Sequence, residues 1–219
     1  MLSLFDNLLT GSLDCLARLS SLFALFLSDN ALTGSLAAVQ GMSFLDEISV
    51  SGNALSGELH FLQYLRGLHA IDFSRNSFSG DLDSLANLTE ITLLSLSYNA
   101  FHGTLDALSA MVHMEAIYLD YNAFSGSLYP LSNMKDIAVI YAQANRLTGS
   151  LAPLQNLTEL QSLLLFDNQL SGALTALDHC PSLTSLRISN NLYAFVFVYV
   201  YVCIYVYVGS EGFSPCRRP

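Results

Sequence analysis

The chain has 219 residues, of which 52% are hydrophobic and only 12% are charged. This length suits one domain with a sizeable core. The formal net charge of −10 excludes a nucleic-acid partner, because phosphate binding requires clustered lysine and arginine. The four cysteines form no CxxC pair, so they predict neither a zinc site nor a disulfide framework.

The first residues of the chain read as the end of a repeat unit. Residues 1–7 (MLSLFDN) match residues 163–168 (LLLFDN), and they lack the basic start and the cleavage site of a signal peptide. Taken as it stands, such a chain is cytosolic. If the full-length protein carries a signal peptide, the expected location is the cell surface or the extracellular space.

A 23-residue period runs through most of the chain. Asparagine occurs at positions 7, 30, 53, 76, 99, 122, 145, 168 and 191. Glycine follows the first eight of these asparagines by four residues, and leucine follows them by six. We therefore predict that residues 1–191 form one repeat solenoid of about eight units, with both ends lacking polar caps.

Each unit predicts one coil. Residues 160–168 (LQSLLLFDN) have the form LxxLxLxxN, in which the last two leucines are spaced by two, the period of a strand. The earlier leucines of the unit are spaced by three, which favours an irregular or 3-10 return path. A single coil cannot bury its leucines alone, so stacked coils are expected to share a continuous core.

The repeated asparagine is predicted to be structural. Its amide offers both a donor and an acceptor, which can satisfy the turn of its own coil and that of a neighbouring coil. This role is assigned to Asn30, Asn53, Asn76, Asn99, Asn122, Asn145 and Asn168. The repeated glycine is expected to adopt a positive φ or to allow close approach between coils.

The pattern LxxLxLxxNxLTGSLxxLxxL resembles the plant-type, extracellular class of leucine-rich repeats, found in receptor ectodomains and in surface antigens of some protozoa. The unit differs from that class in being one residue shorter and in placing Pro130 and Pro153 one residue later. The resemblance implies an α/β-type repeat solenoid: a right-handed coil with a parallel β-sheet on its concave face and a mostly irregular or 3-10 convex side. It also implies a protein or peptide ligand on the concave face.

Two glycosylation sequons, Asn87-Leu-Thr and Asn156-Leu-Thr, lie at the same point of their units. Both asparagines are expected on the outer wall of the solenoid. If the chain enters the secretory pathway, both are predicted glycan sites. The alternative is that the repeat consensus itself favours a polar residue followed by Leu-Thr.

Side chains that alternate with the core leucines are expected to point outward on the concave sheet. In the N-terminal half these positions are mostly serine, whereas the middle and C-terminal units carry aromatic residues. Exposed aromatic side chains are typical binding hot spots, so we predict a ligand-binding patch. It comprises Tyr98, Tyr118, Asp120, Tyr121, Tyr141, Leu164 and Phe166. The alternative is that coil packing or glycans cover these side chains.

No catalytic, metal or cofactor site is predicted. The five histidines fall at five different phases of the repeat, so they build no ladder of metal ligands. The glycines belong to the repeat rather than to a phosphate loop, and no Ser-His-Asp arrangement can be traced. We therefore expect no enzymatic activity.

The repeat pattern stops after Asn191, and residues 192–219 form a low-complexity hydrophobic tail. Residues 192–208 carry no charge and admit three interpretations. They could be a short membrane anchor, although valine and tyrosine are poor helix formers. They could be an aggregation-prone strand. They could also be a translated dinucleotide microsatellite, because alternating T and purine codons encode the alternation of Val or Ile with Tyr or Cys in residues 198–208.

These features together predict a non-enzymatic protein- or peptide-binding module that is a fragment of a cell-surface or secreted protein. One alternative is a truncated receptor ectodomain or the non-functional product of a gene fragment. Another is a cytosolic interaction scaffold. Any membrane association is expected to involve residues 192–208.

Overall fold

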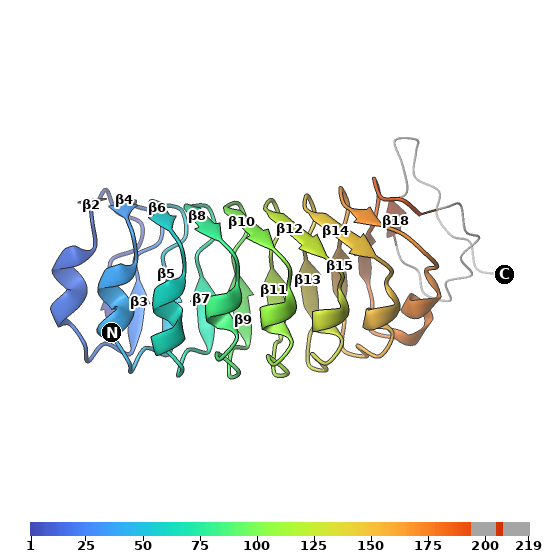
Figure 1. Cartoon of the computed structure of the whole chain (residues 1–219), viewed down its shortest axis with the longest axis horizontal. Helices are drawn as coiled ribbons and strands as arrows, with labels where there is room; N and C mark the ends of the chain where they lie inside the picture. Colours follow the sequence, from blue (N-terminus) through green and yellow to red (C-terminus); the bar gives the residue numbers. More distant parts are fainter. Residues whose placement is uncertain (194–204, 208–219) are drawn as a thin grey trace.

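The computed structural model describes residues 1–193 and 205–207. The chain winds into similar coils that lie side by side along one axis (Figure 1). A complete coil contributes one strand to each of two sheets and one short 3-10 helix between them. In Figure 1 the 3-10 helices face the viewer, one sheet follows the upper edge, and the other sheet lies behind.

The first sheet, called the long sheet below, contains the LxL segment of every unit. Its strands pair in parallel, and each core residue lies beside its equivalent in the next unit, as Ile117 lies beside Ile140. Alternate residues point into the core, so Ile117 is buried while Ala116 and Tyr118 are half-buried. The strands are, in spatial order, β1 (Leu2–Ser3), β3 (Ala24–Phe26), β5 (Glu47–Ser49), β7 (Ala70–Asp72), β9 (Leu93–Ser95), β11 (Ala116–Tyr118), β13 (Val139–Tyr141), β15 (Ser162–Leu164), β17 (Ser185–Arg187) and β18 (Tyr205–Tyr207).

The second sheet occupies part of the return path that the sequence predicted to be mostly irregular or 3-10, so this path contains short strands in addition to the 3-10 helices. Each strand follows the repeated asparagine and ends at or near the repeated glycine. From β4 onward its leucine or phenylalanine is buried, whereas at the first coil the equivalent Leu9 is exposed. These segments are too short to read as strands alone, and their partners lie about one unit away, as for Gly103 and Phe124. The strands are β2 (Thr10–Gly11), β4 (Ala31–Gly34), β6 (Ala54–Gly57), β8 (Ser77–Gly80), β10 (Ala100–Gly103), β12 (Ala123–Gly126), β14 (Arg146–Gly149) and β16 (Gln169–Leu170).

Each 3-10 helix begins directly after the leucine that lies six residues after the repeated asparagine of its coil. In η5 the flanking Leu105 is buried, and so is Leu108 three residues later, as the spacing of the leucines predicted. Pro130 and Pro153 stand in the first turns of η6 and η7, where a missing N–H is harmless. The helices are η1 (Asp14–Arg18), η2 (Ala37–Gly41), η3 (His60–Tyr64), η4 (Asp83–Leu85), η5 (Asp106–Leu108), η6 (Tyr129–Leu131), η7 (Ala152–Leu154) and η8 (Thr175–His179).

One continuous hydrophobic core runs along the solenoid between the two sheets and the 3-10 helices. Its largest members are phenylalanines at matching positions of successive coils. The Phe78 and Phe101 rings stack with centroids 6.4 Å apart, and Phe101 stacks on Phe124 at 6.2 Å. All three side chains are fully buried, so the core is continuous from coil to coil rather than divided into separate units.

A short part of the C-terminal tail belongs to the long sheet. Strand β18 pairs in parallel with β17 and thereby adds residues 205–207 to its end. Within residues 1–193 and 205–207, no helix is long and apolar enough to cross a membrane. The membrane-anchor and microsatellite interpretations of residues 192–208 concern residues that lie largely outside the described part.

Candidate ligand-binding surface

The repeated asparagines hold the turn at the end of each long-sheet strand. The Asn122 side-chain amide donates to the carbonyl oxygens of Leu119, in its own coil, and Leu96, in the preceding coil, at 3.1 and 2.9 Å. Its Oδ1 accepts the backbone N–H of Phe101 at 3.0 Å. One side chain thus satisfies backbone groups of two coils, which fixes the turn that carries the neighbouring surface residues.

The residue before each interior asparagine has a left-handed backbone. Tyr98 and Tyr121 have φ of 57° and 54°, whereas the same turn holds Asp29, Gly52 and Asn190 elsewhere. A left-handed backbone is uncommon for a bulky residue, because glycine, asparagine and aspartate adopt it most readily. The two tyrosines therefore stand at positions where local preference favours smaller side chains.

The seven predicted patch residues lie on the outward face of the long sheet or in the turns just beyond it. Tyr118, Tyr141 and Leu164 occupy matching positions of β11, β13 and β15. Asp120 lies two residues after Tyr118, and Phe166 lies two residues after Leu164. Tyr121 follows Asp120 directly, and Tyr98 holds the equivalent position one coil earlier. Only Tyr98 and Tyr121 are exposed, at 46% and 41%, so the expected open aromatic surface is partly covered by its own members.

The aromatic rings of the patch contact each other in two pairs. Tyr98 and Tyr121 stack with ring centroids 4.3 Å apart, and Tyr118 meets Tyr141 edge to face at 5.2 Å. Two arginines that the prediction omitted border the patch. The Arg75 guanidinium lies 5.9 Å from the Tyr98 centroid, and that of Arg187 lies 4.5 Å from the Phe166 centroid.

Asp120 lies between Tyr118 and Tyr121 in the sequence, one member of each tyrosine pair, and it is only 6% exposed. The Ser97 hydroxyl donates to its carboxylate at 2.5 Å. Burial raises the pKa of Asp120, while the Ser97 hydroxyl and the charge of Arg75 lower it in part. No residue of the described part forms an ion pair with this carboxylate.

Gln143 follows Asp120 by one repeat and is 7% exposed. Its Oε1 is buried without a hydrogen-bond partner, a condition shared within the described residues only by the Tyr193 hydroxyl. Ser97, Asp120 and Gln143 thus form a row of buried polar side chains in three successive coils. Ser97 and Gln143 were not among the predicted site residues, because a buried polar row cannot be recognised from sequence alone.

Both sequon asparagines lie in exposed turns on the opposite side of the coils from the long sheet. Asn87 follows η4 and Asn156 follows η7, each by two residues, and both are exposed. Both occupy the equivalent point of their coils, and their use as glycan sites stays a prediction. A glycan at either asparagine would therefore project away from the aromatic patch.

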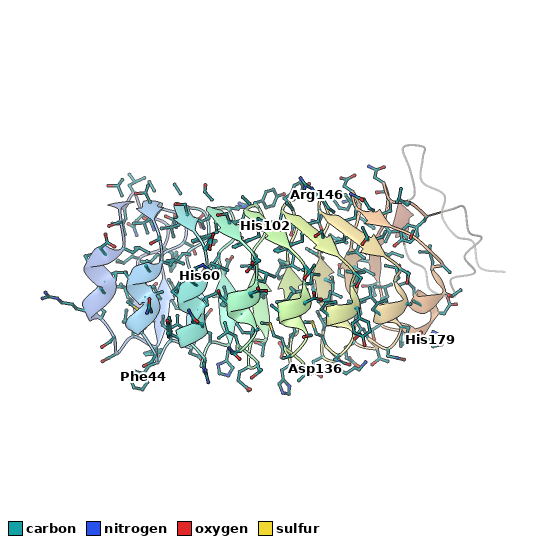
Figure 2. The ribbon with its side chains drawn as sticks, in the orientation of Figure 1. Phe44, His60, His102, Asp136, Arg146 and His179 are labelled. Carbon is teal, nitrogen blue, oxygen red and sulfur yellow. The ribbon has the colours of Figure 1, made fainter. Side chains whose placement is uncertain are left out.

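The histidines of the chain do not converge. His60, His102 and His179 lie on separate coils and are well apart (Figure 2). In residues 1–193 and the short strand β18, no three side chains of histidine, cysteine, aspartate or glutamate could hold one metal ion. The aromatic patch, whose side chains contact one another and two arginines, is therefore the candidate functional site.

Comparison with known proteins places this geometry in a structural class. Neither family models nor curated proteins match the chain. Among solved structures, the PEPR1–AtPEP1 structure is 28% identical, with a TM-score of 0.82 over 88% of this chain and 28% of that one. The Arabidopsis receptor kinase HAESA, solved with the peptide hormone IDA and the co-receptor SERK1, is 23% identical, with a TM-score of 0.82 over 94% of this chain and 37% of that one.

A plant ice-binding protein is also similar, at 25% identity and a TM-score of 0.79 over 88% of this chain and 65% of that one. The repeat, the parallel long sheet and these neighbours define a solenoid of stacked repeats. The chain has the leucine-rich-repeat fold, and leucine-rich-repeat ectodomains of plant receptor kinases are among its structural neighbours. It spans only about a third of the length of the receptor chains compared here.

Proposed function

We propose that this chain is a non-enzymatic module that binds a protein or peptide along the outward face of the long sheet. The observation that carries the proposal is the cluster of Tyr98, Tyr118, Tyr121 and Tyr141, arranged in contacting pairs on the outward face of the long sheet and in the turns just beyond it. Large aromatic side chains held in place by their neighbours lose little entropy on binding and dominate interface energetics. The structural likeness to receptors solved with peptide ligands supports the same proposal.

The proposed cellular context is a cell-surface or secreted protein of which this chain is a fragment. The receptor neighbours and the exposed sequon asparagines at equivalent turns support that context. A truncated receptor ectodomain, a non-functional gene-fragment product and a cytosolic scaffold are the alternatives. Detection of the native chain in the glycosylated surface fraction of its cells would distinguish the first context from the last.

Peptide selection tests the binding proposal directly. The full-length chain, immobilised on beads, is panned against a random library of short peptides, with heat-denatured chain as the reference. We expect sequences enriched by the folded chain only, and a clear loss of their binding when Tyr118 and Tyr141 are both changed to alanine. Tyr129→Ala is the matched control, because that tyrosine is 72% exposed on η6, away from the long sheet.

Two outcomes would contradict the proposal. One is the absence of any enrichment over the denatured chain. The other is a selected peptide that binds the double variant as it binds the wild type. A melting curve accompanies each variant, since loss of cooperative unfolding in the double variant would assign the tyrosines to the fold instead.

A second candidate function, ice binding, is favoured by a regular array on the second sheet. Outward hydroxyl side chains recur in neighbouring strands, which are about 4.8 Å apart in such sheets. Such an array can order water at a fixed repeat. One row contains Thr10, Thr33, Ser56, Ser79, Ser125, Thr148 and Ser171, and a parallel row contains Ser12, Ser35, Thr104, Ser127 and Ser150.

The similar plant ice-binding protein supports this second candidate, whereas His102, Glu58 and Asp81 interrupt the array. Inhibition of ice recrystallisation by the full chain is the test. Activity that is lost in Thr33→Lys but kept in Tyr118→Ala would favour ice binding. No inhibition by the wild type would exclude it.

A further inference from the structure

Asp120 is an unusual residue for a leucine-rich coil. Equivalent positions in other coils hold Ser28, Ser51 and Ser74, whose hydroxyls carry no charge. Aspartate is almost never fully buried unless it is paired, because a charge transferred from water is costly. In the described part of the chain its carboxylate has one side-chain hydrogen bond, from Ser97, and no ion-pair partner.

The surroundings of Asp120 favour a positive charge. Tyr118 precedes it by two residues and Tyr121 follows it directly, and these two residues belong to the edge-to-face pair and the stacked pair, respectively. Faces of aromatic rings attract cations. The protein already uses this preference, since the Arg75 guanidinium lies over the ring of Tyr98 and its charge lowers the pKa of Asp120.

Gln143 supplies a second, independent observation. Its buried Oε1 lacks a donor, and a buried polar atom without a partner costs about 1–3 kcal/mol. It belongs to the coil after Asp120 and to the same row of the surface. Ser97 hydrogen-bonds to Asp120 across one coil, so side chains of this row that are one coil apart can reach a group placed between them. An arriving donor would therefore satisfy two acceptors at once.

We propose that Asp120 and Gln143, flanked by the two tyrosine pairs, form a subsite for a cationic side chain, arginine or lysine, of the bound peptide. This inference rests on the proposed peptide-binding function and specifies the charge of the peptide side chain that binds at the centre of the patch. The guanidinium or ammonium donates to the Asp120 carboxylate and to Gln143 Oε1, and its flat or aliphatic part packs on the tyrosine rings. Entry between the rings requires side-chain rotation, which is common at interfaces.

The chain's charge agrees with a basic partner. Its formal net charge is −10, so a cationic ligand is attracted over distances beyond contact. That general attraction must be separated from the specific subsite. Asp72 provides the control, because it also lies on the outward face of the long sheet, where the Ser74 backbone N–H and hydroxyl donate to its carboxylate.

The test uses the peptides selected by the full-length chain and measures their dissociation constants by fluorescence anisotropy. Three comparisons are made: Asp120→Asn against wild type, Asp72→Asn against wild type, and each peptide against its analogue in which arginine becomes citrulline, or lysine becomes acetyl-lysine. We expect a shared arginine or lysine at one position of the peptides. Asp120→Asn and the neutral analogue should each weaken binding roughly 30-fold or more, as when one member of a buried charge pair is removed, whereas Asp72→Asn should change it less than about threefold.

The outcomes separate the two proposals. If no peptide is enriched, peptide binding itself fails and the subsite fails with it. If peptides are enriched without a common basic residue, or bind Asp120→Asn as tightly as Asp72→Asn, peptide binding stands and the subsite is overturned. Should Asp120→Asn not fold, the neutral analogues on wild-type chain still decide, because equal affinity for charged and neutral peptide contradicts the subsite.

Discussion

The ring of Tyr98 stacks on the ring of Tyr121 with centroids 4.3 Å apart and an interplanar angle of 14°. Both residues have a left-handed backbone, which the solenoid imposes on the position before the repeated asparagine. The spacing of neighbouring coils brings the two rings into stacking distance. Desolvation by this packing, and then the neighbouring Tyr121 and Asp120, raise the pKa of Tyr98.

The unpaired charge of Asp120 predicts a gain of stability when it is removed. Burial raises its folded-state pKa above the usual 3.8, so its contribution is most favourable at low pH and is lost as pH rises through the folded-state pKa. Asp120→Asn should therefore stabilise the free chain by about 1 kcal/mol near neutral pH, with little difference in strong acid. Chemical denaturation over a pH series measures this. An equal effect at all pH values would rule out the charge as its cause.

The repeated asparagines form a ladder of side chains that bridge successive coils, and removal of one asparagine from its interior should destabilise the solenoid. Asn122→Ala leaves the backbone N–H of Phe101 without its acceptor and removes one of the two amide donors to the Leu96 carbonyl, which keeps the hydrogen bond from Asn99. We expect a loss of about 1–3 kcal/mol, the usual penalty for stranded buried groups. The denaturant midpoint is compared with that of Asn133→Ala, an exposed asparagine outside the ladder that should change it little. Equal midpoints for the two variants would show that the ladder is dispensable.

The phenylalanine stack makes a second prediction about stability. Phe101 is fully buried between Phe78 and Phe124, so Phe101→Ala opens a cavity and should cost about 3–5 kcal/mol. Phe101→Leu should cost clearly less, because the same core position holds Leu147 two coils further on. Thermal melts of both variants provide the measurement. A leucine variant as unstable as the alanine variant would mean that the stacking geometry, rather than filled volume, dominates.

The turn glycines predict a position-dependent effect of adding a methyl group. Gly126 has φ of +80°, and a Cβ there would lie 3.2 Å from Thr104 Cγ2. Gly126→Ala should destabilise the chain by about 1–2 kcal/mol, the cost of a left-handed backbone for a residue with a Cβ. Gly41→Ala is the control, because nothing lies within 4 Å of a Cβ at that site. Similar unfolding free energies for the two variants would contradict this account.

Both sequons should be used if the chain passes through a secretory pathway. Asn87 and Asn156 are exposed in turns, as a glycosyltransferase requires. Expressed in eukaryotic cells behind an added signal peptide, the chain should carry two glycans. Intact mass should fall by one glycan in Asn87→Gln, by one in Asn156→Gln and by both in the double variant. Unmodified secreted wild-type chain would assign the Asn-Leu-Thr sequences to the repeat consensus alone.

The sequence by itself determined the coil and its core. A strict 23-residue period identifies the buried positions, because each repeated leucine must face the same interior in every turn of the solenoid. The spacing of two in the LxL segment predicted the strands of the long sheet, such as β11, and the spacing of three predicted the 3-10 helices, such as η5. The period also placed Tyr118 and Tyr141 in one row.

Only the tertiary structure decided what happens between coils. The second sheet was missed because hydrogen bonds between segments about one unit apart create it, not the alternation within four residues of β10 or β12. The burial of Asp120 and Gln143 likewise could not be read from their positions in the repeat, because the equivalent Ser51 and Ser74 are only half-buried. Periodicity assigns a residue to a face, but its neighbours in the stacked coils set its exposure, its pKa and its hydrogen-bond partners, as Ser97 and Arg75 do for Asp120. The proposed cation subsite is therefore visible only when the coils are stacked.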